Sequence, residues 1–165
     1  MLRDLREREW PVRWVRDDGL HITLKFFGEV TSDRVDAIED VLRHAAAGLP
    51  PIRLVLGKGG AFPTPQRPRV LHLEVQAGPE LEVLQDRLER ACSDIGFAPE
   101  GRPFVPHITL GRVREGHRLP PNAVEQLEEL PAGAPFQANR VVLFESRQSP
   151  GGPVYTVRSA QPFAS

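Results

Sequence analysis

The phrase His-Ile-Thr-Leu occurs twice in this chain, beginning at His21 and again at His107. Each copy lies in a stretch whose composition predicts a β-strand. Because side chains alternate between the two faces of a strand, His21 shares a face with Thr23, and His107 shares a face with Thr109. Free imidazole titrates with a pKa of about 6.5, so one ring can accept a proton while the other donates one. Two histidines, each beside a hydroxyl, are the groups needed for acid–base chemistry around one small anion.

The apolar residues of each phrase face the opposite way. Leu20, Ile22, Leu24 and Phe26 share this other face in the first stretch, and Ile108 and Leu110 share it in the second. A single histidine on a strand is more often a packed, hydrogen-bonded residue than a catalytic one. The repetition of the histidine together with its threonine neighbour favours catalysis.

Length and composition limit the possibilities. The chain has 165 residues, of which 40% are hydrophobic and 26% charged, which predicts one globular domain over residues 1–165. The formal net charge of −1 argues against binding of polymers by charge alone. Residues 41–73 nevertheless contain five Lys or Arg and no acid, which suits either a phosphate-bearing ligand or a solvated basic surface. No secretory signal or membrane-spanning apolar run is visible, so we expect a cytoplasmic protein.

Strands and helices mix without strict alternation, which favours an α+β fold with antiparallel sheets. Helices are predicted over residues 31–47, 79–95 and 122–130, and residues 1–9 resemble the end of another. Strands are predicted over residues 12–16, 20–27, 52–56, 70–75, 106–113, 136–145 and 154–157. The Gly- and Pro-rich run at residues 57–68 predicts a loop, and residues 149–152 predict a turn.

The two His-x-Thr-x motifs and their flanks resemble those of the 2H phosphoesterase superfamily. Within it, the chain is most similar to the bacterial and archaeal RNA 2′,3′-cyclic phosphodiesterases, also called 2′-5′ RNA ligases. The similar segments cover nearly the whole chain, in this order: residues 14–30, 62–71, 96–112 and 149–155. The resemblance implies a bilobal fold, in which two antiparallel sheets are related by pseudo-twofold symmetry around a central cleft and the helices lie outside.

The beginning of the chain departs from this family. The family usually starts with an apolar strand, a proline-containing turn and a full helix, whereas Met1 lies inside what should be that helix. Roughly twenty residues, a strand and half a helix, are therefore expected to be missing relative to the family. Either the start codon was assigned late or this member lost the strand.

The resemblance also implies an activity: metal-independent hydrolysis of a 2′,3′-cyclic phosphate on RNA or a nucleotide to a 2′-phosphate. His21 is expected to protonate the departing 3′ oxygen, and His107 to take a proton from water. Thr23 and Thr109 are expected to donate hydrogen bonds to the non-bridging phosphate oxygens. The reverse reaction with an RNA 5′-hydroxyl would form a 2′-5′ linkage. The expected partners are RNA ends or nucleotides, with no membrane, metal or other cofactor, and the protein is expected to be a monomer.

Two charged residues are further candidates for substrate binding. Lys25 shares a face with His21 if the strand is regular, and then either contacts phosphate or reaches solvent. Arg112 follows the second motif closely. In a regular strand it would point away from His107, so a role in the site requires a bulge or the end of the strand.

Aromatic side chains are candidates for stacking on a nucleobase, as in single-stranded RNA recognition. Phe62 and Tyr155 are the two that we select, with packing as the alternative role for Phe62. His72 alternates with leucines in a predicted strand. Its face could line the cleft, but we interpret it as a packed or hydrogen-bonded histidine.

Three other functions stay open at the level of sequence. The chain could be a noncatalytic module that binds RNA ends or nucleotides, or a 2H enzyme that acts on another cyclic phosphate. A zinc hydrolase is disfavoured, because the sequence contains no His-x-x-x-His pair and no acids clustered near the motifs.

Overall fold

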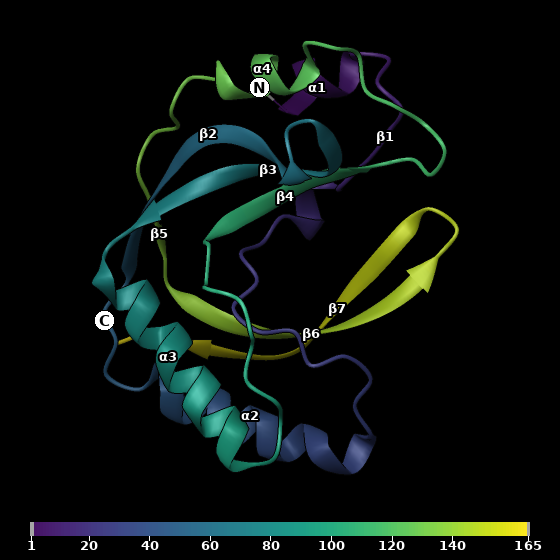
Figure 1. The fold of residues 1–165 in the computed structure, drawn as a ribbon. Helices are drawn as coiled ribbons and strands as arrows, with labels where there is room; N and C mark the ends of the chain where they lie inside the picture. The colour runs from purple at the N-terminus through teal and green to yellow at the C-terminus, as the bar shows by residue number, and fades with distance from the viewer. Residues whose placement is uncertain (1, 165) are drawn as a thin grey trace.

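The structure is a computed structural model that describes residues 2–164. Two antiparallel sheets face each other across the middle of the molecule, and the helices lie outside them (Figure 1). The larger sheet has the strand order β1-β4-β3-β2-β5, and the smaller sheet is the hairpin β6-β7. This is the predicted α+β arrangement, and the predicted helices are present at nearly the predicted positions.

The elements have the following bounds. The larger sheet consists of β1 (Val12–Trp14), β2 (Ile52–Thr64), β3 (Arg67–Ala77), β4 (His107–Val113) and β5 (Phe136–Ala138). The smaller sheet consists of β6 (Arg140–Ser149) and β7 (Gly152–Pro162). The helices are α1 (Leu2–Glu7), the single 3₁₀ turn η1 (Asp17–Gly19), α2 (Ser32–Ala46), α3 (Pro79–Asp94) and α4 (Ala123–Glu128). Among residues 2–164, no helix is both long enough and apolar enough to cross a membrane.

Two apolar clusters hold these elements together. One cluster packs α2 and α3 against residues of both sheets, and the other packs α1 and α4 against the larger sheet. Three of the four apolar motif residues pack against the first cluster: Ile22, Leu24 and Ile108. The fourth, Leu110, is fully buried in the second cluster. Phe26, which strand alternation places on the same face as Ile22 and Leu24, is instead 77% exposed, because residues 20–27 do not form a regular strand.

The predicted loop at residues 57–68 is wrong. β2 continues to Thr64, and β3 begins at Arg67, so that only a tight turn separates the two strands. A Cβ atom on Gly59 would lie 2.6 Å from the carbonyl oxygen of Leu127 in α4. Glycine is present here because a neighbouring element approaches the strand closely, and not because the chain turns.

The predicted strand at residues 20–27 is also wrong. This segment descends as a coil from β1 to α2 (Figure 1) and makes one isolated antiparallel bridge, between Ile22 and Ile108. A hollow of about 2630 Å³ lies beside it, bordered by β6 and by buried side chains of α2 and α3. A strand requires a ladder of backbone hydrogen bonds to a neighbouring strand. On the side of the hollow this segment has no neighbouring strand among residues 2–164, so it stays a coil.

Candidate active site

One backbone bridge joins the two His-x-Thr-x motifs. Ile22 pairs with Ile108, which is the equivalent position of the second motif, and the pairing is antiparallel. An antiparallel bridge between equivalent residues relates the two motifs by a local twofold rotation. Both isoleucines pack against the same apolar cluster. The flanking residues of both motifs therefore lie on the opposite face from the isoleucines.

This bridge determines how the four polar residues are placed. In an antiparallel pair centred on the isoleucines, His21 lies opposite Thr109, and Thr23 lies opposite His107. Such opposite residues have Cβ atoms about 4.5–5.5 Å apart, and the diagonal between the two histidines is about 7–8 Å. The structure thus brings the four predicted site residues together on one face.

The two imidazole rings are fixed in the same way. His21 Nδ1 lies 2.8 Å from the carbonyl oxygen of Gly19, and His107 Nδ1 lies 2.7 Å from that of Val105. A carbonyl only accepts hydrogen bonds, so each Nδ1 carries the hydrogen. Nε2 of each ring is then free to accept a proton in the neutral form or to donate one in the charged form.

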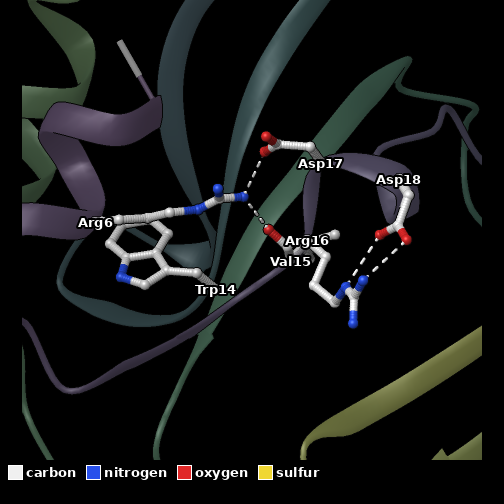
Figure 2. A pocket seen from close by; sticks show the side chains of 6 residues that line it. All are labelled: Arg6, Trp14, Val15, Arg16, Asp17 and Asp18. Atoms are coloured by element: carbon white, nitrogen blue, oxygen red, sulfur yellow. Dashed lines mark hydrogen bonds and ion pairs between the residues drawn. The ribbon is translucent and has the colours of Figure 1, made fainter.

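A clamp holds the turn that precedes His21. Arg6 of α1 donates to the carbonyl oxygen of Val15 at 2.5 Å and pairs with the Asp17 carboxylate at 2.8 Å. Figure 2 shows these contacts in a small pocket of about 410 Å³, where Arg16 also pairs with Asp18. The charged groups of this pocket are engaged with one another. We therefore interpret it as support for the first motif.

Aromatic rings flank both histidines. Tyr155 contacts the His21 ring edge-on at a centroid distance of 4.9 Å. Phe62 contacts the His107 ring in the same manner at 5.0 Å. Both predicted stacking residues therefore adjoin the site, one beside each histidine. The stacking of a nucleobase on them stays a prediction.

A third histidine lies behind His107. His72 is 95% buried and stacks on Phe62 at a centroid distance of 4.0 Å, and its ring contacts His107 at 5.6 Å. Burial, and then the nearby charge of His107, lower the pKa of His72 to about 4, so the ring is neutral near pH 7. The interpretation of His72 as a packed residue is confirmed. Its contact with His107 was not predictable, because it depends on the pairing of β3 with β4.

Lys25 has polar partners within the protein. Its ammonium group lies 3.0 Å from both carboxylate oxygens of Glu89 in α3 and 3.0 Å from the carbonyl oxygen of Ala98. These three bonds use all three donors of the ammonium group. The ammonium group is thus engaged within the protein, and a contact of Lys25 with substrate stays a prediction. That prediction rested on a regular strand, which residues 20–27 do not form.

Arg112 follows a bulge in β4, which is one of the two conditions under which it can face the site. β4 pairs Gly111 with Leu71 but Thr109 with His72, so Leu110 is an extra residue in the ladder. Such a bulge reverses the alternation of faces beyond it. Arg112 is consequently on the same face as Thr109, and its side chain is exposed. The sequence did not reveal that Arg13 of β1 lies directly opposite Arg112.

Metal-ligating side chains are dispersed in the described part of the chain. Among residues 2–164, no three His, Cys, Asp or Glu side chains gather closely enough to hold a metal ion. The donor set that a zinc hydrolase needs is thus not found within these residues.

Comparison with known proteins identifies the family of this chain. A sequence profile of the 2′-5′ RNA ligase superfamily matches residues 2–150. The chain belongs to that superfamily. It is 35% identical over 155 residues to the RNA 2′,3′-cyclic phosphodiesterase of Methanothermobacter thermautotrophicus, in a match that covers 92% of this chain and 83% of the relative.

Solved structures show the same fold. TT0787 of Thermus thermophilus superposes with a TM-score of 0.80 at 25% identity, over 98% of this chain and 87% of that protein. E. coli LigT complexed with 3′-AMP superposes with a TM-score of 0.76 at 24% identity, over 99% of this chain and 90% of that protein. The predicted 2H phosphoesterase fold of this superfamily member is therefore confirmed.

Proposed function

We propose that this chain hydrolyses the 2′,3′-cyclic phosphate of an RNA end or a nucleotide and leaves a 2′-phosphate. The observation that carries the proposal is the bridge between Ile22 and Ile108. It sets two histidines diagonally on one face, each beside a hydroxyl and each with a free Nε2. Curated relatives with this superfamily's sequence pattern are named RNA 2′,3′-cyclic phosphodiesterase, which supports the choice of substrate.

The reaction needs one proton acceptor and one proton donor on opposite sides of phosphorus, because attack and departure occur roughly in line. His107 removes a proton from water as its oxygen bonds to phosphorus. His21 protonates the 3′ oxygen as the bond between phosphorus and that oxygen breaks. This assignment of roles follows the superfamily, since the Nδ1 contacts of the two rings are alike.

The charge that develops on the phosphate is the second requirement. Thr23 and Thr109 donate hydroxyl hydrogen bonds to the non-bridging oxygens, and the Arg112 guanidinium is available on the same face. The reverse reaction, in which an RNA 5′-hydroxyl takes part in place of water, joins two ends through a 2′-5′ linkage. We infer that hydrolysis is the main direction because water is far more abundant than RNA ends.

The test is hydrolysis of a nucleoside 2′,3′-cyclic phosphate in the presence of EDTA, with chromatographic identification of the product. His21→Ala and His107→Ala should each lower kcat by about 10²–10⁴-fold, which is the usual contribution of one proton transfer. His117→Ala is the matched control, because His117 is an exposed histidine in a loop. Urea unfolding of all three variants separates lost chemistry from lost structure.

The rate of the wild-type protein should fall at both acidic and alkaline pH, because one histidine must be neutral while the other is protonated. Binding without turnover would assign the chain to noncatalytic modules instead. A 3′-phosphate product would reverse the assumed leaving group, and loss of activity in EDTA would require a metal.

A further inference from the structure

Two arginines face each other at one end of the row of site residues. Arg13 of β1 lies directly opposite Arg112 of β4. Their neighbours in the same pairing, Val12 and Val113, point to the other face, where Val12 is buried in the cluster under α1 and α4. Both arginines consequently lie on the face of Thr109, and both are exposed and line the hollow beside residues 20–27.

This arrangement is unfavourable in the absence of a ligand. Like charges directly opposite each other in an antiparallel pair destabilise a sheet. The ion pairs found within residues 2–164 include neither Arg13 nor Arg112, whereas six other arginines have a carboxylate partner: Arg6, Arg16, Arg43, Arg90, Arg147 and Arg158. A pair of unneutralised guanidinium groups beside an anion-binding face indicates a site for a further anion.

The position of Arg13 relative to the histidines follows from the strands. β1 and the Ile22 bridge lie along the same edge of β4, so Arg13 continues the row that contains His21 and Thr23. Arg112 is three residues beyond Thr109, which corresponds to about 10 Å along a strand. The arginine pair thus lies further along the cleft than the histidine pair.

Arg13 also lies against the hairpin of the smaller sheet. A Cβ atom on Gly152 would lie 3.3 Å from Arg13 Cδ, so the side chain packs along the start of β7. Tyr155, three residues later on the same strand, contacts His21. Arg13 therefore lies beside the start of the strand that also carries the tyrosine next to His21.

We propose that Arg13 binds a second phosphate of the substrate, on the far side of the terminal nucleoside from the cyclic phosphate. The substrate class is then a nucleotide unit with two phosphates: either an RNA end with its internucleotide phosphate, or a nucleoside cyclic phosphate with a 5′-phosphate. This inference rests on the proposed function. It identifies Arg13 as a residue that distinguishes these substrates from a nucleoside with a cyclic phosphate alone.

The experiment compares wild type and Arg13→Gln on three substrates. These are a nucleoside 2′,3′-cyclic phosphate, the same compound with a 5′-phosphate, and a dinucleotide that ends in a 2′,3′-cyclic phosphate. The variant should lose about 10- to 100-fold in kcat/KM on one or both of the doubly phosphorylated substrates, as expected for a lost charged hydrogen bond. It should be unchanged on the first substrate. A loss confined to the dinucleotide assigns the subsite to the internucleotide phosphate.

Two further measurements exclude a structural role. The salt dependence of kcat/KM on the dinucleotide should become weaker by about 0.7 in the log–log slope. The melting temperature of the ligand-free variant should stay the same or rise, because a like-charge contact is removed. Arg90→Gln is the control, since Arg90 is an exposed arginine of α3 paired with Asp86.

An equal loss on all three substrates, or no loss on any, would overturn the role of Arg13. If wild type cleaves none of them, the proposed function fails independently. Calorimetric binding of a nucleoside 3′-phosphate and of its 5′-phosphorylated form then still tests the subsite, and equal affinity of the two for wild type would refute it.

Discussion

Replacing Lys25 by methionine separates a role in folding from a role in substrate binding. Methionine retains an apolar stem of similar length and removes the charge. The Lys25 and Glu89 side chains are 6% and 16% exposed, and their charged groups are 3.0 Å apart. The substitution therefore leaves a carboxylate that is largely shielded from water and has lost its cationic partner.

The expected cost follows from this burial. Removing one partner of a buried ion pair typically costs about 3–5 kcal/mol. We expect the lower end, about 3 kcal/mol, because Glu89 still accepts a hydrogen bond from the Glu100 backbone N–H at 3.2 Å. For a chain of this length, each kcal/mol lowers Tm by roughly 2–4 °C, so Lys25→Met should melt about 6–12 °C lower.

The assay combines urea unfolding with steady-state kinetics at a temperature where both proteins are folded. Lys25→Met should keep KM within about twofold of wild type, since no ammonium donor is left for phosphate. The double variant Lys25→Met/Glu89→Leu should regain part of the stability, because apolar groups replace both charges. A variant that unfolds like wild type but shows a tenfold higher KM would refute this reasoning.

Two further predictions concern the second motif and its support. The folded-state pKa of His72 lies near 4, below the ordinary value of 6.5, so the unfolded chain takes up a proton first as the pH falls. Between pH 7 and pH 5 the wild type should lose about 2 kcal/mol of unfolding free energy more than His72→Phe does. Gly59→Ala should lower the free energy of unfolding by about 1–3 kcal/mol, because the added Cβ would clash with Leu127 of α4. Gly101→Ala is the control: its Cβ has no atom within 4 Å, so its melting temperature should equal that of wild type.

Local signals account for what the sequence predicts well. The spans of α2 and α3 follow from apolar periodicity and from end signals such as Pro79 and Gly96, all of which act within a few residues. The failures at residues 20–27 and 57–68 have a different origin. A strand depends on a partner, and a glycine in a strand depends on what packs against it; both are properties of the tertiary structure.

The same distinction applies to the site. The two histidines and their threonines are predictable because the motif is repeated, and the alternation around the Ile22–Ile108 bridge places them on one face. The ion pair of Lys25 was not predicted, because that alternation was extended through a segment that is not a strand. Arg13 was missed because its relation to Arg112 depends on the pairing of β1 with β4 and on the bulge at Leu110.

The coil at residues 20–31 gives the first motif less support than the second. The second motif is part of β4 and pairs with β3 through His107, Ile108 and Thr109. The coil is tied to the rest of the molecule by the Ile22 bridge, the Lys25–Glu89 pair and a few partly buried apolar side chains. Local unfolding begins where such ties are fewest. If this coil loosens, His21 is displaced while the larger sheet, which carries His107, stays folded. The catalytic arrangement would therefore be lost before the rest of the fold unfolds.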